Sequence, residues 1–254
     1  MSAPSSTVAR QLLDHLWHRY VQDVPHARTF LSLCATPFAN DHVAFRSIRR
    51  PGSGIAAFRA VFERLGWREG GTYTFPDAHL EAIHLSHPDG LPRVFLSELV
   101  PEALSPAAQA ILARLPADVE PPSSDDPAVL AAWFAPPAPP AEADLLALEP
   151  ESQYGAWLCA FGRMVNHFTA AVPDVEVWQA RLAEAGVPMK GVIEGAPGTD
   201  LRQTATRAAS LTIALAGGGV RSWPYAYLEI AERHHGFDGF LGAQARQLFD
   251  MTRR

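Results

Sequence analysis

The chain has 254 residues, 48% of them hydrophobic and 19% charged, and it carries a net charge of −6 at pH 7. These proportions are typical of a globular protein, and an acidic balance without runs of Lys or Arg argues against a nucleic-acid-binding surface. No apolar stretch approaches membrane-spanning length, and the N-terminus MSAPSSTVARQLL lacks the basic start and apolar run of a secretory signal. Two cysteines without metal-ligand spacing, Cys34 and Cys159, favour a reducing cytoplasm.

Residues 1–39 are expected to be helical, because a Ser-Ser-Thr run offers a cap and apolar residues follow it at helical spacing. Residues 40–99 then indicate a β-α-β-β-β unit. The stretch NDHVAFRSI (Asn40–Ile48) alternates like a strand, and a helix is expected from Gly54 to Leu65. Three short strand-like segments follow it, GTYTF, HLEAIHLS and RVFLSEL, each bounded by Pro, Gly or Asp.

Residues 100–164 differ in composition, since the chain from Pro116 to Pro150 is rich in Pro, Ala and acidic residues. Such a segment cannot form one regular element. We expect it to join short helices, such as Ser105–Leu115 and Pro127–Phe134, as a connector without chemistry of its own.

Residues 165–236 repeat the first pattern. VNHFTAAV is strand-like, a helix is expected from Asp174 to Ala185, and VPMKGVI, RAASLTIAL and SWPYAYLEIAER are predicted as further strands. A C-terminal helix is expected over residues 237–254.

The two β-α-β-β-β patterns indicate an internal duplication. His42 corresponds to His167 and Glu98 to Glu229, with the His and Glu separated by 56 residues (42 to 98) in the first half and by 62 (167 to 229) in the second. One unit is too small to close a core. The sequence therefore predicts a single α+β domain in which duplicated βαβββ units form a curved sheet around a metal-binding cleft, with additional helices.

Three side chains are candidate metal ligands because they lie on the first and last strands of these units: His42, His167 and Glu229. Two imidazoles and one carboxylate form the facial-triad set that suits non-haem Fe(II), and the same set also holds Zn²⁺. Each residue has a structural alternative, such as a histidine bonded to a backbone carbonyl or a Glu229–Arg233 ion pair. The remaining histidines that we considered lack this correspondence, and we expect them at the surface or behind the ligands: His79, His84, His87, His234 and His235.

Arg46 shares a strand face with His42 and lies about 13 Å from it in an extended strand. That separation is too long for a direct hydrogen bond, but it suits a ligand whose near end binds the metal and whose far end carries a carboxylate. The planar guanidinium matches a carboxylate. A structural salt bridge within the cleft is the alternative.

A resemblance adds to these inferences. DHVAFRSI, FLSEL, NHFTAAV, LRQTATRAA and YAYLEIAER, in this order, resemble the DUF1338 proteins, which are the 2-oxoadipate dioxygenases/decarboxylases of the vicinal oxygen chelate superfamily. The resemblance implies Fe(II) held by His42, His167 and Glu229, with Arg46 as the catalytic residue that binds the substrate carboxylate. It also implies that 2-oxoadipate reacts with O₂ to give 2-hydroxyglutarate and CO₂.

Two points stay open within this resemblance. The family members that we compare are longer, which leaves the identity of the 2-oxo acid open. Gln203 and Thr204 of LRQTAT are candidates for hydrogen bonds to substrate oxygens, with bonds inside a loop as the alternative.

Two other functions fit the same duplicated scaffold. A glyoxalase-type lyase or isomerase would hold Zn²⁺ or Ni²⁺ with Glu98 as a fourth ligand beside His42, His167 and Glu229. A non-catalytic module would keep only the ligand-binding cleft.

Overall fold

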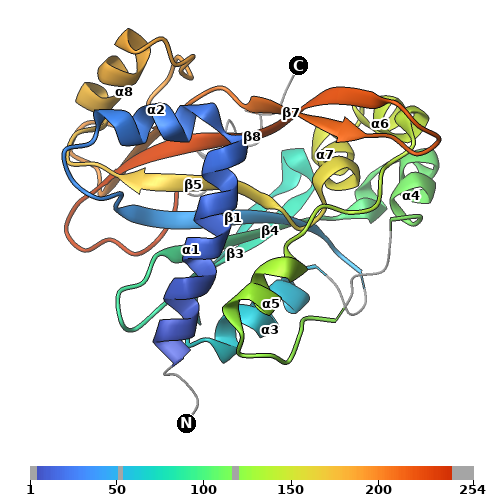
Figure 1. The fold of residues 1–254 in the computed structure, drawn as a ribbon, viewed down its shortest axis with the longest axis horizontal. Coiled ribbons are helices and arrows are strands. Elements are labelled where there is room, and N and C mark those ends of the chain that lie inside the picture. Colours follow the sequence, from blue (N-terminus) through green and yellow to red (C-terminus); the bar gives the residue numbers. More distant parts are fainter. Residues whose placement is uncertain (1–4, 51–53, 116–119, 242–254) are drawn as a thin grey trace.

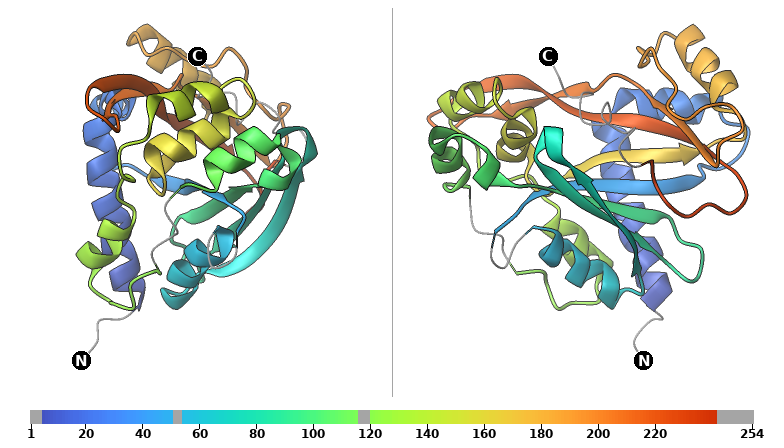
Figure 2. Two further views of the ribbon diagram at one scale, coloured as in Figure 1. Left: turned by 90° about the vertical axis from the view of Figure 1, so that its right-hand side faces the viewer. Right: turned by 180° about the vertical axis from the view of Figure 1, so that it is seen from behind.

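The computed structural model describes residues 5–50, 54–115 and 120–241. An eight-stranded mixed sheet runs through the molecule in the order β2-β3-β4-β1-β5-β8-β6, with β7 paired to β8, so the sheet is open with edges at β2 and β6. Figure 1 shows the long helix α1 crossing this sheet, and Figure 2 shows the sheet from behind. The strands are β1 (Asn40–Ile48), β2 (Arg68–Phe75), β3 (Leu80–Ser86), β4 (Arg93–Leu99), β5 (Val165–Ala171), β6 (Leu201–Ala205), β7 (Ala209–Ala214) and β8 (Val220–Arg233).

Helices cover the sheet and fill the segment between the two units. The α-helices are α1 (Ser5–Asp23), α2 (Pro25–Leu33), α3 (Ile55–Arg64), α4 (Pro106–Leu112), α5 (Pro127–Trp133), α6 (Glu142–Leu148), α7 (Gln153–Phe161) and α8 (Val175–Glu184). Two short 3₁₀ helices, η1 (Pro76–Ala78) and η2 (Pro101–Ala103), flank β3 and β4. No helix of the described ranges is long and apolar enough to cross a membrane. The mixed sheet with its covering helices confirms the α+β class.

The first unit follows the predicted order β1-α3-β2-β3-β4. β1 pairs in parallel with β4, and β4 and β2 each pair antiparallel with β3. The parallel β1–β4 pair is possible because α3 and the β2–β3 hairpin together carry the chain back across the sheet. β1 is buried on both faces from Asp41 to Ile48, so its polar side chains, such as His42 and Arg46, are buried together with its apolar ones.

The second unit differs from the prediction in its strands. VPMKGVI is not a strand: its backbone forms an isolated bridge from Met189 to Thr206, and a second bridge, Glu194 to Gln203, lies just beyond the motif. The strand is LRQTA instead, a segment for which the sequence pattern predicts no strand, and it pairs antiparallel with β8 as β6. Pro188 and Gly191 interrupt the first segment. The polar residues of β6 are buried and have partners distant in sequence, such as Glu176 for Arg202, which a sequence pattern does not reveal.

RAASLTIAL contains the strand β7, but β7 belongs to an added hairpin. It pairs with the first part of β8, from Val220 to Ala226, while the second part of β8 lies between β5 and β6. The second unit therefore repeats the first element by element. β5 corresponds to β1 and α8 to α3. The irregular segment 189–194 corresponds to β2, β6 to β3, and the second part of β8 to β4.

The strand register also corrects the pairing of the two glutamates. In the first unit, His42 lies opposite Arg93, and Glu98 follows Arg93 by five residues. In the second unit, His167 lies opposite Tyr227, and Glu232 follows Tyr227 by five residues. The repeat equivalent of Glu98 is therefore Glu232, and the equivalence of Glu98 with Glu229 was wrong.

Hydrogen bonds at the two helix starts show the same equivalence. Glu98 Oε2 accepts from Ile55 N at the start of α3 at 2.9 Å, and Glu232 Oε2 accepts from Val175 N at the start of α8 at 2.9 Å. A carboxylate at a helix N-terminus satisfies free N–H groups and complements the helix dipole. Each of the two glutamates thus caps the helix of its own unit.

The connector is partly as predicted. α4 and α5 correspond to the expected helices, but α6 and α7 were not expected. Every residue of α7 after Gln153 is buried, and Trp157 Nε1 donates to the carbonyl of Tyr225 in β8 at 2.6 Å. The C-terminal helix predicted over 237–254 lies outside the described residues except for 237–241, which form no helix.

Candidate metal centre

The site lies on the sheet face opposite α1. Phe168 of β5 packs against Trp17 and Tyr20 of α1. Because side chains alternate along a strand, its neighbours His167 and Thr169 point to the other face. The antiparallel β1–β5 pair places His42 opposite Thr169, so the imidazoles of the two units meet across these central strands.

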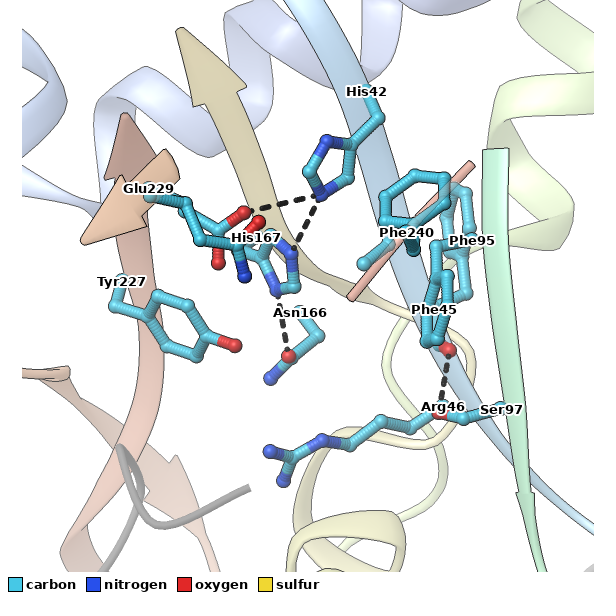
Figure 3. Close-up of a pocket in the computed structure, with 12 residues that line it drawn as sticks. His42, Phe45, Arg46, Phe95, Ser97, Asn166, His167, Tyr227, Glu229 and Phe240 are labelled. Carbon is cyan, nitrogen blue, oxygen red and sulfur yellow. Dashed lines mark hydrogen bonds and ion pairs between the residues drawn. The ribbon is translucent and has the colours of Figure 1, made fainter. Parts of the chain in front are cut away.

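The three predicted ligands converge there. The candidate ligand atoms of His42, His167 and Glu229 all lie within 4.8 Å of one another, and each residue is buried. His42 Nε2 lies 3.3 Å from His167 Nε2 and 3.3 Å from Glu229 Oε1. Figure 3 shows the three side chains turned toward one another from β1, β5 and β8.

The residue before each histidine holds the ring in place. Asp41 Oδ1 accepts from His42 Nδ1 at 2.8 Å, and Asn166 Oδ1 accepts from His167 Nδ1 at 3.0 Å. A carboxylate has no proton to donate, so His42 carries its proton on Nδ1. The lone pair of its Nε2 atom then points toward His167 and Glu229. Asp41 in turn accepts two hydrogen bonds from Arg233, at 2.6 and 3.0 Å. Arg233 therefore holds Asp41, and not Glu229 as the structural alternative proposed.

Burial sets the protonation of the cluster. It lowers the pKa of both histidines, and it raises the pKa of Glu229 from 4.5 to about 8. Thr169 Oγ1 donates to Glu229 Oε1 at 3.2 Å. Two neutral imidazoles and one carboxylate, with converging ligand atoms and supported outer nitrogens, fit a divalent cation, whose charge would favour the ionised form of Glu229.

The pocket beside these ligands is small and has mostly apolar walls. Its volume is about 20 Å³, which is room for about one water molecule. The ring of Phe240 lies 4.7 Å from that of His42 and 4.9 Å from that of Phe95, and it helps to close the pocket. The lining residues are His42, Ala44, Phe45, Arg46, Phe95, Ser97, Asn166, His167, Gln203, Tyr227, Glu229 and Phe240.

Arg46 lies in this pocket, on the same strand as His42. It is only 2% exposed, and its guanidinium carbon lies 4.9 Å from the ring of Tyr154 and 5.1 Å from that of Trp157. Figure 3 shows the guanidinium reaching across the pocket below Asn166 and Tyr227. Both rings belong to α7, so the connector that we expected to lack chemistry supplies the support of this arginine.

Gln203 and Thr204 separate in the structure. Gln203 lines the pocket, whereas Thr204 Oγ1 donates to the carbonyl of Val192 at 2.9 Å and is not among the described lining residues. Gln203 Nε2 donates to Glu194 Oε2 at 3.2 Å, and Glu194 Oε1 pairs with Lys190 Nζ at 2.6 Å. The Gln203 amide orientation is thereby fixed, because Glu194, when ionised, can only accept.

Two buried amide atoms remain available to a ligand. Within the described ranges, Gln203 Oε1 and Asn166 Nδ2 have no hydrogen-bond partner, although buried polar atoms normally have one. Each is fixed by the bond of the other atom in its amide group. The pocket therefore presents one oriented acceptor and one oriented donor beside the ligands.

The predicted four-ligand set is not formed among the described residues. Glu98 caps α3 and also accepts from Arg49 Nε at 3.2 Å. In β4, Phe95 lies two residues beyond Arg93, just as Glu229 lies two residues beyond Tyr227 in β8. Phe95 is therefore the register equivalent of Glu229 in the first unit. An apolar ring thus stands where a second carboxylate would complete a four-ligand site. Of the other histidines, His84 packs against Phe240 with ring centroids 5.3 Å apart, behind the ligands.

Several residues of the site were missed from the sequence: Asp41, Asn166, Tyr227, Phe240, Lys190 and Glu194. One signal was present, since a residue with a side-chain oxygen precedes each ligand histidine, in DH and NH. The others come from segments whose positions depend on tertiary contacts.

Comparison with known proteins gives a consistent family. A family model described as 2-oxoadipate dioxygenase/decarboxylase matches residues 12–120 and 127–253. The curated 2-oxoadipate dioxygenase/decarboxylase of Oryza sativa is 27% identical over 96% of this chain and 78% of its own length, and that of Arabidopsis thaliana is 25% identical. The crystal structure of the Oryza sativa hydroxyglutarate synthase in complex with 2-oxoadipate has a TM-score of 0.88 at 26% identity, covering 100% of this chain and 94% of that one.

A more distant solved structure has the same fold. The hydroxyglutarate synthase of Pseudomonas putida, also in complex with 2-oxoadipate, has a TM-score of 0.73 at 21% identity. The match covers 98% of this chain and 68% of that one, so the Pseudomonas putida protein has further residues outside the shared fold.

Proposed function

Because the chain belongs to the 2-oxoadipate dioxygenase/decarboxylase family, we propose that it is an Fe(II)-dependent enzyme that converts 2-oxoadipate and O₂ to 2-hydroxyglutarate and CO₂. The observation that carries the proposal is the convergence of His42, His167 and Glu229 within 4.8 Å in a buried pocket. In this reaction the C1–C2 bond breaks, C1 leaves as CO₂ and O₂ is the oxidant. Atoms and electrons balance without another co-substrate.

The donor set favours Fe(II). Two imidazole nitrogens and one carboxylate oxygen are the donor set of the facial-triad iron oxygenases, so His42, His167 and Glu229 would hold Fe(II), which would supply O₂ activation. Asp41 and Asn166 keep both histidines oriented through Nδ1. Phe95 occupies the place of a fourth ligand, which keeps the protein ligands at three and favours the dioxygenase over the glyoxalase-type alternative.

Arg46 is proposed to bind the far carboxylate of the diacid. It lines the same pocket as the ligands, and its guanidinium is held between the rings of Tyr154 and Trp157. A buried, oriented guanidinium pairs with a carboxylate through two parallel hydrogen bonds, which selects a diacid over an acid with an apolar tail.

Asn166 and Gln203 are proposed to orient the reacting end. Asn166 Nδ2 is a donor for a carboxylate or keto oxygen of the substrate. Gln203 Oε1 is an acceptor, so it suits the hydroxyl group of the product or a bound water molecule. The apolar walls, with Phe45, Phe95 and Phe240, exclude water from the reaction.

The proposal is tested with ligand variants. His42→Ala and His167→Ala should each lose bound iron and 2-oxoadipate-dependent O₂ uptake, while keeping the far-UV circular dichroism of the parent protein. His235→Ala is the matched control, because the His235 side chain is 79% exposed and contacts Asp200 outside the pocket. Full iron content and full O₂ uptake in His42→Ala would contradict the ligand assignment.

The cytoplasm remains the proposed compartment. Cys34 and Cys159, the only cysteines of the sequence, are free thiols, as a reducing compartment favours. The two plant relatives carry chloroplastic names.

A further inference from the structure

A buried ion pair lies behind the metal pocket, and the proposed reaction does not use it. Lys190 Nζ lies 2.6 Å from Glu194 Oε1, and the two side chains are only 8% and 6% exposed. Both residues belong to the irregular segment 189–194 beside β6. Burying two charges costs free energy, and an apolar pair of similar size is often as stable. The pair therefore calls for a role other than stability.

Backbone hydrogen bonds already hold this segment against β6. Lys190 N donates to the carbonyl of Ala205 at 2.7 Å, and Glu194 and Gln203 exchange both of their backbone bonds, at 2.8 and 2.9 Å. Two residues that exchange both bonds lie directly opposite each other, with their side chains on the same face. The backbone thus brings the Glu194 carboxylate beside the Gln203 amide without help from the ion pair.

The hydrogen bonds from Lys190 to Gln203 have a fixed direction. An ammonium group only donates, and the ionised carboxylate of an ion pair only accepts. Glu194 Oε2 accepts from Gln203 Nε2 at 3.2 Å, so the NH₂ group of the amide faces Glu194. Among the described residues, the buried Gln203 Oε1 has no hydrogen-bond partner, and Gln203 lines the metal pocket. A ligand with an O–H group would supply that partner.

Strand register places Gln203 near the metal ligands. In the β6–β8 pair, Ala205 lies opposite Glu229 and Gln203 lies opposite Ala231. Side chains two residues apart in a strand share one face, so Gln203 and Glu229 point to the same side of the sheet. They are diagonal neighbours, a relation that separates two residues by about 7–8 Å. A ligand held next to Glu229 is therefore within reach of the Gln203 side chain.

We propose that Lys190 and Glu194 are positioning residues, which turn the Gln203 amide so that its Oε1 accepts a hydrogen bond from the 2-hydroxyl group of the product. The inference rests on the proposed function, because that reaction converts a 2-oxo acid to a 2-hydroxy acid. A keto oxygen has no proton to donate, so it would face Gln203 Oε1 as a second acceptor. The ion pair thus raises the affinity for a 2-hydroxy acid relative to that for the 2-oxo acid of the same length.

The test compares two ligands that differ only at C2, 2-hydroxyadipate and 2-oxoadipate. Their dissociation constants are measured by isothermal titration calorimetry with Fe(II)-loaded protein without O₂, so that no turnover occurs. In Glu194→Gln, the new amide oxygen still accepts from Lys190, so its NH₂ group faces Gln203, and Gln203 turns its own NH₂ group to the pocket. The ratio of the two affinities should then move about tenfold toward the oxo acid, as expected for one exchanged hydrogen bond.

Glu176→Gln is the matched control. Glu176 pairs with Arg202, the neighbour of Gln203 in β6, at 2.5 Å, and it is not among the residues that line the pocket, so its loss should leave the ratio unchanged. Burial raises the pKa of Glu229, and the charge of Glu194 raises it further. Removal of that charge changes the metal ligand for both acids alike, so this effect cancels in the ratio.

A second variant shows whether Glu194 acts through Gln203. Gln203→Met removes the acceptor at nearly the same side-chain volume, and by itself it should also shift the ratio about tenfold toward the oxo acid. In Glu194→Gln/Gln203→Met the ratio should equal that of Gln203→Met alone. If one single variant does not fold, the other decides.

Two results would overturn the inference and leave the proposed function intact. One is an unchanged ratio in Glu194→Gln or Gln203→Met, and the other is a further shift in the double variant. Failure of the wild-type protein to bind either acid would instead contradict the proposed function and, with it, the inference.

Discussion

Raising the pH from 6 to 8 should lower the unfolding free energy of the metal-free protein, and replacing Glu229 with Gln should remove this pH dependence. Burial raises the pKa of Glu229 to about 8, from an ordinary value of 4.5. Between these values the folded state holds a proton that the unfolded state has released, so stability falls as the pH rises.

The magnitude follows from this difference in pKa. Up to about pH 8 the Glu229 carboxyl stays protonated in the folded protein, whereas it is ionised in the unfolded chain over the whole range from pH 6 to 8. The unfolding free energy therefore falls by about 2 kcal/mol over this range. The histidines act in the opposite direction, because burial lowers the pKa of His42 and His167 and stability rises as the pH approaches 6.5. Both proteins contain these histidines, so their contribution largely cancels in the difference between wild type and Glu229→Gln.

Urea denaturation with a chelator, at pH 6, 7 and 8, measures this difference. The wild-type protein should lose about 2 kcal/mol of unfolding free energy relative to Glu229→Gln, a shift of roughly 4–8 °C in Tm. Zn²⁺ should stabilise the wild type more at pH 8 than at pH 6, because the ligand must be ionised. Parallel pH profiles for the two metal-free proteins would refute the claim that Glu229 is buried with a raised pKa.

Three further predictions concern other residues. Arg46→Lys should lower kcat/KM for 2-oxoadipate by about tenfold, and Arg46→Met should affect 2-oxoadipate more than 2-oxohexanoate in O₂-uptake assays; an equal effect on both acids would make Arg46 structural. Glu98→Ala and Glu232→Ala should each lower the unfolding free energy by about 1 kcal/mol and leave the iron content unchanged. Loss of iron in Glu98→Ala would instead indicate that Glu98 is a metal ligand. Phe240→Ala should open the pocket to water and so raise the ratio of O₂ consumed to 2-hydroxyglutarate formed. An unchanged ratio would show that Phe240 does not close the pocket.

The repeat explains how much could be predicted from the sequence. Strand alternation and helix spacing in residues 40–99 identified the first unit, and the matching histidines then indicated where the units meet. His42 and His167 were found because they occupy equivalent places on the first strands of the two units.

Register and buried polar pairs limited the rest. A His-to-Glu spacing cannot distinguish Glu229 from Glu232, because the added β7 hairpin changes the chain length between the equivalent positions. β6 was missed because Arg202, Gln203 and Thr204 are polar; they are buried with partners such as Glu176 and Glu194, which only the fold brings close. The role of α7 was missed for the same reason, since only the fold brings Tyr154 and Trp157 close to Arg46.

The most direct test of the central claim is the stoichiometry of the reaction. Protein loaded anaerobically with Fe(II) should be mixed with 2-oxoadipate and O₂, and all products quantified. We predict one O₂ consumed, one CO₂ released and one 2-hydroxyglutarate formed for each 2-oxoadipate. Turnover of 2-oxoadipate without O₂ consumption would contradict the account and favour a lyase or isomerase.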